Sequence, residues 1–394
     1  MRPRLLLIGH TYAALENRKK LQALAAHFEL VCVTSTTEQH LVLGRPSSEF
    51  DNDSDAPTRS YQLIRLPRSG QTSTTFHYIG LTAVMRSCSF DVVLVENEPW
   101  ARVCWQARVL KALFQAHALF GEFTWENIER PGWKGALLAP IYRAMTATTD
   151  FIIAGNQAAA QLVQRCGAHA GNVLVAPQLG VDLDNHLPAS SAERTMLRQA
   201  CGLPADAFIV GYCGRLTEEK GLHELLQACE ALQNVHLAIL GSGRLDSWLK
   251  EQQDTRPWLH LLPTRPHFEI PSFLRCLNVF VLASKPVRTM QLCWEEQFGH
   301  VLIEAMACGV ATLGSSSGAI PEVIGHEKAV FPHGDATALA SCIRDVMNNS
   351  TIVQSQLDRT RRLYTHDAVA KQWAAFIHHH LAAPAHVSEA HQRP

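Results

Sequence analysis

Short apolar runs alternate with amphipathic segments along almost the whole chain. In the first half, runs of strand length lie at 5–8, 30–34, 61–66, 91–96, 118–123, 151–154 and 172–177. Segments with helical periodicity lie between them, at 16–28, 78–87, 101–114 and 135–148. Alternation of this kind is typical of a parallel sheet covered by helices on both faces.

A second alternation of the same kind begins at Ile209. Its predicted strands are 209–213, 237–240, 259–262, 279–282, 310–313 and 329–331. The sequence therefore predicts an α/β protein of two Rossmann-like domains that face each other across a cleft. We expect domains at 1–185 and 186–366, with a linker around 180–194. A mobile loop is expected at 36–59. We also expect a terminal helix at 367–383 that packs back on the first domain, followed by a polar tail at 384–394.

Composition narrows the class of protein. A chain of 394 residues is too long for one ordinary core, and 47% hydrophobic with 18% charged residues is typical of a soluble globular protein. The net charge of −1 gives no reason to expect a nucleic-acid partner. The 11 cysteines form no CxxC pair, which favours reduced core thiols over disulfides or zinc. With no signal peptide or bilayer-long apolar run, we expect a cytoplasmic protein, at most peripheral to the membrane.

One stretch carries a carboxylate where apolar residues dominate. Residues 301–308 form an apolar run of helix formers, yet Glu304 lies in its middle. Glu296 precedes this helix, and Gly299 leaves room for close approach to the helix start. A buried carboxylate costs several kcal/mol unless it is hydrogen-bonded. Either Glu304 is exposed or paired with a nearby base, or it faces a polyhydroxyl ligand whose charged part meets the helix start.

Cations lie in the first strand-to-helix turn of the second domain. Arg215 and Lys220 flank this turn, and free helix N–H groups beside two cations suit a diphosphate. An ordinary charged loop, with Lys220 paired to Glu218 or Glu219, is the alternative. The first domain has no GxGxxG after its first strand, which disfavours a nicotinamide-dependent dehydrogenase, and the chain has no GxxxxGK[ST], GxSxG or HExxH. The cations and the two carboxylates together suit a sugar nucleotide.

Three segments resemble a known family. GRLTEEKG (214–221), EQFGHVLIEAMACG (296–309) and GAIPEVIG (318–325) resemble the retaining glycosyltransferases of family 4, which have the GT-B fold. The Glu-x7-Glu spacing of Glu296 and Glu304 is that family's signature. The segments 10–25, 96–100, 123–131, 154–156 and 177–182 are similar to a bacterial subgroup that has WKEQFGR where this chain has WEEQFGH (294–300).

The resemblance implies metal-independent transfer, with retention, of a hexose-type sugar. The donor would be a UDP- or GDP-sugar, used as substrate without another cofactor, and the acceptor a hydroxyl of a glycan, a lipid-linked molecule or a small molecule. Arg215 and Lys220 would bind the diphosphate, Glu304 the ribose and Glu296 the sugar. Of these, Glu296, Arg215 and Lys220 are the candidate catalytic residues. The full set of implied donor-binding residues is Gly214, Arg215, Lys220, Thr264, Glu296, Phe298, Gly299, His300, Val301 and Glu304.

The chain departs from the family at several of these places. Many relatives have a Gly-Gly turn after the first strand, where this chain has GHTYAAL. Many also carry a histidine close to the position of Glu122. Glu295 stands where the subgroup has lysine and His300 where it has arginine, so two cations near the site are lost.

The acceptor is expected at the turns of the first domain. The candidate acceptor-binding residues are Thr11, Tyr12, Glu96, Glu98, Trp100, Glu122 and Asn127. For Glu96 and Glu98, capping of the next helix is an equal alternative to sugar binding. The basic and aromatic residues of 100–111 suit either docking on a membrane surface or core packing. A sugar-nucleotide epimerase and a non-catalytic sugar-nucleotide-binding protein remain as alternative functions.

Overall fold

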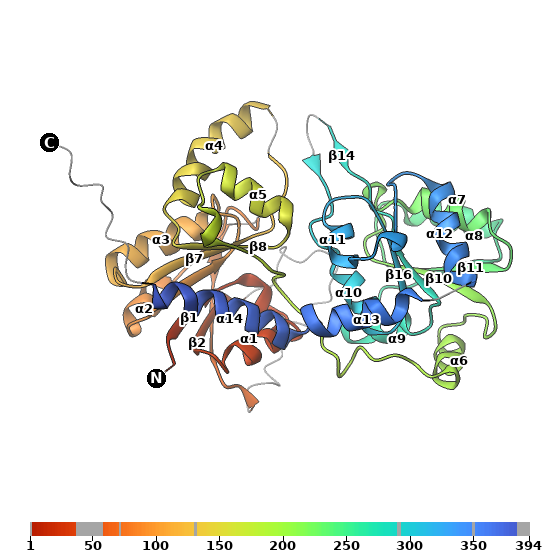
Figure 1. Cartoon of the computed structure of the whole chain (residues 1–394), viewed down its shortest axis with the longest axis horizontal. Coiled ribbons are helices and arrows are strands. Elements are labelled where there is room, and N and C mark those ends of the chain that lie inside the picture. Colours follow the sequence, from red (N-terminus) through yellow and green to blue (C-terminus); the bar gives the residue numbers. More distant parts are fainter. Residues whose placement is uncertain are drawn as a thin grey trace.

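The computed structural model describes residues 2–36, 58–70, 72–129, 132–289, 293–348 and 351–383. Two parallel sheets lie side by side, each covered by helices on both faces (Figure 1). The predicted α/β class with two Rossmann-like units is therefore confirmed. Most of the loop predicted at 36–59 and all of the tail from 384 lie outside the described residues.

The first sheet has the strand order β3-β2-β1-β6-β7-β8-β9, with every pairing parallel. Its strands are β1 (Arg4–Ile8), β2 (Glu29–Ser35), β3 (Gln62–Leu66), β6 (Val92–Glu96), β7 (Leu119–Thr124), β8 (Phe151–Ala154) and β9 (Val173–Val175). Its helices are α1 (Arg18–Leu24), α2 (Leu81–Ser87), α3 (Arg102–Phe114), α4 (Gly132–Ala147) and α5 (Gln157–Arg165). A short antiparallel pair, β4 (Arg68–Ser69) and β5 (His77–Tyr78), lies beside them.

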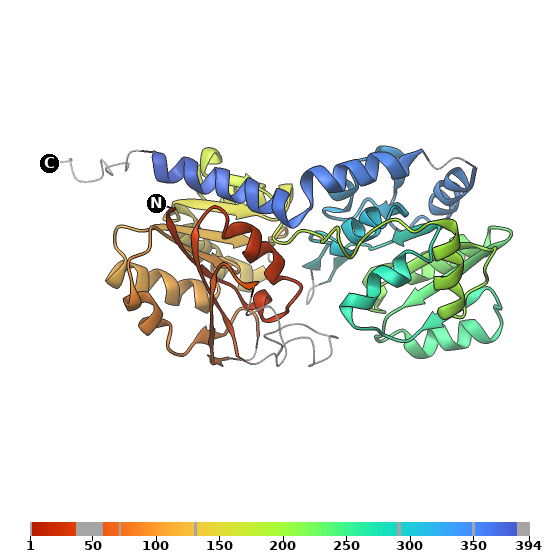
Figure 2. The ribbon, with the colours of Figure 1, turned by 90° about the horizontal axis from the view of Figure 1, so that it is seen from below.

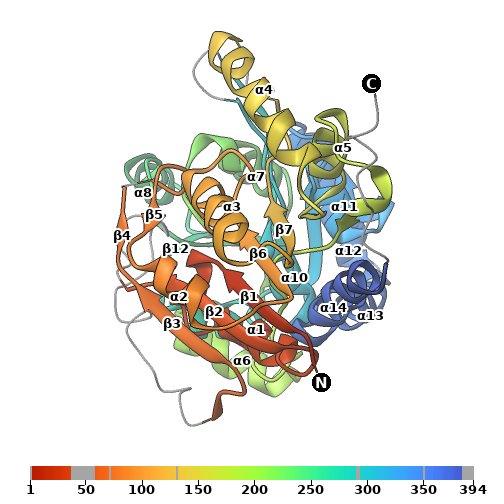
Figure 3. The same ribbon diagram turned by 90° about the vertical axis from the view of Figure 1, so that its left-hand side faces the viewer.

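Both faces of the first sheet are buried, which explains why its strands are continuous apolar runs. Successive side chains of a strand point to opposite faces. In β1, Leu5 and Leu7 pack with α1 and the C-terminal helix, whereas Leu6 and Ile8 pack with α2 and α3. Figure 3 shows these two helix layers on either side of the sheet.

The second sheet has the order β12-β11-β10-β13-β16-β17 and is also parallel. Its strands are β10 (Phe208–Cys213), β11 (Val235–Leu240), β12 (Leu259–Leu262), β13 (Val279–Leu282), β16 (Ala311–Ser315) and β17 (Val330–Phe331). The helices are α6 (Ser191–Ala200), α7 (Leu222–Glu230), α8 (Asp246–Asp254), α9 (Ile270–Leu274), α10 (His300–Ala307), α11 (Ile320–Ile324), α12 (Ala336–Asn348) and α13 (Ile352–Leu363). The pair β14 (Val287–Arg288) and β15 (Cys293–Trp294) forms a small antiparallel ribbon.

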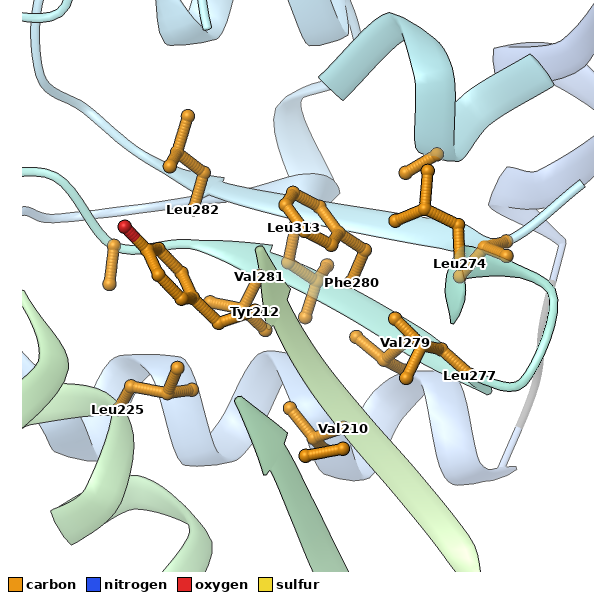
Figure 4. Packing of buried hydrophobic residues seen from close by; sticks show 14 of the residues in the cluster. Val210, Tyr212, Leu225, Leu274, Leu277, Val279, Phe280, Val281, Leu282 and Leu313 are labelled. Atoms are coloured by element: carbon orange, nitrogen blue, oxygen red, sulfur yellow. The ribbon is translucent and has the colours of Figure 1, made fainter. Parts of the chain in front are cut away.

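The core of the second sheet is a continuous cluster of aliphatic and aromatic side chains. Figure 4 shows Val210 and Tyr212 of β10 beside the side chains of β13. Gly211 lies between them, and a Cβ there would come within 2.3 Å of the Leu277 side chain. Close packing across β10 therefore fixes the turn that follows the strand, which carries Gly214 and Arg215.

Two crossings between the sheets run side by side (Figure 2). The linker after β9 pairs with the segment before α14 (His366–Ala382), because Val181 N–H donates to Tyr364 O at 2.7 Å. At the preceding residue, a Cβ on Gly180 would lie 2.4 Å from His366 N. Only glycine allows this approach without displacement of the backbone.

Helix α14 returns to the first sheet and packs against α1. Trp373 is fully buried there, stacks on Phe123 with ring centroids 5.5 Å apart, and donates from Nε1 to Pro177 O at 3.1 Å. The ammonium group of Lys20 lies 3.1 Å from a Trp373 ring centroid. The C-terminal helix is therefore part of the first core.

Replacement of Trp373 tests this role of α14. We expect Trp373→Ala to lower the free energy of unfolding by about 3–5 kcal/mol, because the change leaves a cavity and removes the cation–π contact of Lys20. Urea denaturation followed by circular dichroism measures the loss. Lys371→Ala, at an exposed position of the same helix, should change stability by less than about 0.5 kcal/mol. Equal stability of the two variants would contradict the packing described here.

Candidate functional site

A cavity of about 1350 Å³ lies between the two sheets. This volume exceeds the roughly 300–1,000 Å³ typical of a small-molecule pocket. The turns that follow parallel strands form much of its wall, as expected for an open α/β sheet. The predicted residues among its lining are Thr11, Gly214, Arg215, Thr264, Phe298, His300, Val301 and Glu304.

Glu304 is buried in this wall, with 4% of its surface exposed. Its Oε1 atom accepts hydrogen bonds from His267 Nε2 at 2.9 Å and from His300 Nδ1 at 3.0 Å. Burial alone would raise the pKa of Glu304, but the two histidines lower it well below its usual range. The carboxylate on the apolar helix is therefore ionised, paired and in contact with the cavity.

Lys220 and Glu296 form a buried ion pair. Lys220 Nζ lies 2.6 Å from Glu296 Oε2, which also accepts from Ser284 Oγ at 2.7 Å. The same ammonium group lies 4.6 Å from the Trp294 ring centroid. The structure thus brings two of the three candidate catalytic residues into contact, although neither is in the lining of the cavity. Lys220 pairs with Glu296 and not with Glu218 or Glu219 as the charged-loop alternative proposed.

The backbone around Glu296 also joins the two domains. Glu296 O accepts from Asn127 Nδ2 at 3.4 Å and Gln297 O accepts from Asn156 Nδ2 at 2.7 Å. In return, Gln297 Nε2 donates to Trp125 O at 3.1 Å. A Cβ on Gly318, whose φ is +53°, would lie only 2.0 Å from Glu296 O. Gly318 therefore packs directly against the backbone of Glu296.

Arg215, the third candidate catalytic residue, lines the cavity and has a half-exposed side chain. Its guanidinium lies 3.8 Å from Glu219, a loose ion pair that a ligand anion could replace at little cost. Gly299 is left-handed, with φ +74°, and starts α10 beneath the cavity wall. Arg215 and the start of α10 thus offer positive charge to an anion.

Two predicted acceptor residues belong to a buried network in the first domain. Glu96 accepts from Tyr12 OH at 2.6 Å, from Lys20 Nζ at 3.0 Å and from Gln178 Nε2 at 2.7 Å. Burial lowers the pKa of Lys20 to about 8, against the opposing effect of Glu96. Tyr12 and Glu96 are at most 2% exposed, so the network supports the cavity through Gln178, which lines it.

Glu98 and Trp100 bind the loop after β7. The Glu98 carboxylate accepts from Thr124 Oγ1 and from the backbone N–H of Trp125. Burial, together with the charge of Glu126, raises the pKa of Glu98 to about 7. Trp100 Nε1 donates to Glu126 Oε2 at 2.6 Å. Both residues therefore shape the loop that carries Trp125 into the cavity.

Glu122 lies away from the cavity lining, on the face of the first sheet covered by α3. It is fully buried, accepts from Thr149 Oγ1 at 2.9 Å and lies 3.4 Å from Arg108 Nη2. Burial raises its pKa to about 7 even though Arg108 opposes the shift. The structure therefore corrects the expectation that Glu122 reaches the acceptor side: its carboxylate is enclosed within the first domain.

The sequence interpretation missed His267 and Gln178. His267 lies in the short helix η6 (His267–Glu269), in the turn after β12, and holds Glu304 across 37 residues of sequence. The strand-end rule points to that turn, but no motif marks the histidine. Gln178 Oε1 accepts from Trp125 Nε1 at 2.9 Å and so links the Glu96 network to the cavity. Within the described ranges, no three His, Cys, Asp or Glu side chains are grouped to hold a metal ion.

Comparison with known sequences identifies the second domain. Residues 193–363 match the family described as "Glycosyl transferases group 1". The chain is 31% identical over 193 residues to a D-inositol 3-phosphate glycosyltransferase of Xylanimonas cellulosilytica, which covers 46% of this chain and 44% of the relative. It is 27% identical over 210 residues to the putative colanic acid biosynthesis glycosyltransferase WcaL of Escherichia coli. That alignment covers 51% of this chain and 48% of WcaL. The chain thus spans about half the length of these relatives.

Solved structures resemble the whole chain. Sucrose-phosphate synthase from Thermosynechococcus elongatus has a TM-score of 0.71 at 20% identity, covering 97% of this chain and all of that one. HepE of Anabaena, solved in complex with UDP-glucose, has a TM-score of 0.67 at 18% identity, covering 96% of this chain and all of that one. The arrangement of the two sheets is therefore that of the GT-B fold.

The buried Glu122 predicts a pH-dependent contribution to stability. Its pKa is about 7 in the folded protein and near 4.5 in the unfolded chain. The folded state therefore binds more protons between these values, and stability falls as the pH rises through this window. We expect Glu122→Gln to remove up to about 3 kcal/mol of the stability difference between about pH 5 and pH 8. Urea denaturation at several pH values measures it, and an unchanged pH dependence would refute the assignment.

Proposed function

We propose that this chain, whose residues 193–363 match the group 1 glycosyltransferases, transfers a hexose-type sugar from a nucleotide-diphosphate donor to an acceptor hydroxyl, with retention. The observation that carries this proposal is the second-domain wall of the cavity. There Arg215, the start of α10 and the ionised Glu304 face one space. Cationic groups suit a diphosphate and a buried carboxylate suits the hydroxyls of a ribose.

The ion pair below this wall gives Lys220 and Glu296 their proposed roles. An ammonium group has three donors, and Lys220 uses one of them on Glu296, so it can still donate to a phosphate oxygen. As the nucleotide diphosphate leaves, Arg215 and Lys220 would stabilise its growing negative charge. Glu296, held by Lys220 and Ser284, would orient the hydroxyls of the donor sugar near the reacting carbon. The acceptor hydroxyl would attack from the face that the diphosphate leaves.

A uridine nucleotide is the first donor to test, since HepE, which has the same fold, was solved with UDP-glucose. The base would lie by Thr264, which lines the cavity after β12. The acceptor would enter from the first domain, where Thr11 and Trp125 line the opposite side. Polysaccharide biosynthesis is the proposed setting, because several relatives carry that role in their names.

An activity assay separates the three function classes. A transferase releases nucleotide diphosphate only when an acceptor is present. An epimerase interconverts the sugars of the donor, and a binding protein does neither. Binding of candidate donors is found first with a panel of UDP- and GDP-sugars in a thermal-shift assay, because a bound donor raises the unfolding temperature.

The same proposal includes association with a membrane surface through the first domain. Each helix in the described ranges is too short or too polar to span a bilayer. On α3, however, Trp105, Val109 and Leu113 follow one another at four-residue intervals and are 42–67% exposed. The protruding helix α4 adds Trp133 and Leu137, which are 73% and 64% exposed (Figure 1). Exposed apolar side chains on one helical face suit the boundary between headgroups and acyl chains.

Replacement of Glu296 tests the site. We expect Glu296→Gln to lower kcat by at least about 100-fold, because the negative charge beside the reacting sugar is lost. The amide oxygen can still accept from Lys220 and Ser284, which limits the stability that is lost when Lys220 has no counter-charge, so the fold should persist. Release of UDP in the presence of acceptor measures activity, and circular dichroism checks folding. Glu251→Gln, exposed on α8, is the control. Full activity of Glu296→Gln would refute the assignment of Glu296 to the catalytic site.

Paired serine substitutions test the membrane surface. Trp105→Ser with Leu113→Ser should weaken cosedimentation with phosphatidylglycerol vesicles by about tenfold, since apolar area inserted into the interface is lost. Met196→Ser is the control, because Met196 is 68% exposed but lies on α6 of the second domain. An equal effect of both changes would argue against a specific surface on α3.

A further inference from the structure

Two histidines meet at one oxygen atom of Glu304. His267 Nε2 and His300 Nδ1 both donate to Oε1, at 2.9 and 3.0 Å. A carboxylate oxygen offers about two lone-pair sites, so Oε1 is saturated. Oε2 has no hydrogen-bond partner among the described residues, while Glu304 lines the cavity. Oε1 thus holds the Glu304 side chain in place, and Oε2 remains able to accept a hydrogen bond from a ligand.

The partners of His300 determine its protonation state. Its Nδ1 faces the Glu304 carboxylate and its Nε2 lies 3.2 Å from the carbonyl oxygen of Gly180. A carboxylate and a carbonyl only accept hydrogen bonds, so both ring nitrogens must carry a hydrogen. Only a ring with hydrogens on both nitrogens can satisfy these two acceptors at once.

His267 lies between two carboxylates. Its Nε2 donates to Glu304, and its Nδ1 is 4.0 Å from Glu16 Oε1 of the first domain. Both ring nitrogens of His267 thus face carboxylate oxygens. Through this ring, the carboxylate of the second domain is connected to the loop after β1 across the cavity.

Two further histidines nearby, His186 and His366, have lowered pKa values. Burial lowers the pKa of His186, and burial with the neighbouring charge of His300 lowers that of His366 to about 3. One ring nitrogen of each is buried without a hydrogen-bond partner. These two are neutral and do not compete for Glu304. The charged and titratable groups around the pair are Glu304, Glu16, Lys19, Asp182, His186, His366, Cys213 and Arg215.

A cation at the first residue of α10 is unfavourable by itself, because a helix start is already electropositive. The Glu304 carboxylate offsets part of that cost. An anionic ligand at the helix start would offset more, so binding of a diphosphate and protonation of His300 should strengthen each other. Arginine at this position would supply the same charge permanently.

We propose that His267 and His300 act as protonated positioning residues that hold Glu304 by Oε1, leave Oε2 to accept the ribose hydroxyls, and make donor binding depend on their charge. The inference rests on the proposed function, since it takes the ligand to be a nucleotide sugar. Deprotonation of either ring removes one hydrogen bond to Oε1 and one positive charge from the donor site. Donor affinity should then fall as the pH rises through the range in which histidine loses its charge.

Calorimetric binding of UDP-glucose tests the inference. This probe is suitable because its diphosphate keeps one charge state throughout, whereas the terminal phosphate of UDP titrates near about pH 6. For the wild type we expect Kd to rise about tenfold between about pH 6 and pH 8.5. His300→Arg should reduce this rise to about threefold, because the charge at position 300 becomes permanent while His267 can still lose its charge. His300→Gln should bind more weakly than the wild type at the lower pH and should keep only the part of the pH dependence that His267 contributes.

His267 receives a matched test. The double change His267→Gln with His300→Gln should bind weakly and independently of pH. In turnover assays, the glutamine variants should raise the donor KM and leave kcat nearly unchanged, which a general loss of structure would not do. His379→Gln, exposed on α14, controls for the removal of a histidine, and thermal melting checks the fold of each variant.

The outcomes separate the inference from the proposed function. Wild-type binding that is independent of pH, or tighter binding by His300→Gln, would overturn the role of the histidines and leave the donor site intact. Wild-type protein that binds neither UDP-glucose nor any other nucleotide sugar would instead refute the proposed function. A pH dependence that persists in His300→Arg at full size would also overturn the inference for His300.

Discussion

The ion pair between Lys220 and Glu296 is the contact on which the site depends. Two opposite charges are enclosed at 2.6 Å, and Ser284 donates a second hydrogen bond to the same carboxylate oxygen, Glu296 Oε2. Removal of either partner would leave an uncompensated buried charge, which costs several kcal/mol. The side chain of Glu296 is fixed in this way while its carbonyl oxygen accepts from Asn127 of the first domain. Glu296 thus contributes its carboxylate to the candidate site of the second domain and its carbonyl oxygen to the contact between the domains.

The two domains treat their buried charges differently. In the first domain, the Glu96 carboxylate is satisfied by Tyr12, Lys20 and Gln178, and so has little capacity left for a ligand. In the second domain, Glu304 has one saturated oxygen and one that is still available. Hydrogen bonds offset the cost of burying both carboxylates, but only Glu304 keeps an oxygen atom that can accept a hydrogen bond from a ligand in the cavity. The first network is thus a rigid support and the second a binding surface.

Hydrophobic periodicity was sufficient to predict the order of the parallel strands, because both sheets are buried on both faces and their strands are apolar runs, but it missed helix α5 between β8 and β9. The same pattern also marked Glu304 as out of place. The position of Glu122 could not be predicted from periodicity alone. In β7 it shares a face with Phe120, which packs against α3, so its carboxylate meets Arg108. Alternation tells which residues share a face, but only the packed helices tell which face borders the cavity. His267 could not be predicted either, since its partner Glu304 lies 37 residues away in sequence.

Hydrogen bonds join the two domains along the edge near Glu296. Besides the bond from Asn127, the hydrogen bonds at this edge are Asn156 to Gln297, Gln297 to Trp125, and Gln157 to Glu322. Each contributes about 0.5–1.5 kcal/mol net, so a modest change in the angle between the sheets costs only a few kcal/mol. The linker at Gly180 and the start of α14 run together where the chain crosses between the domains, and His300 donates to Gly180 O at that place. His300, which positions Glu304, is therefore also attached to the linker between the domains.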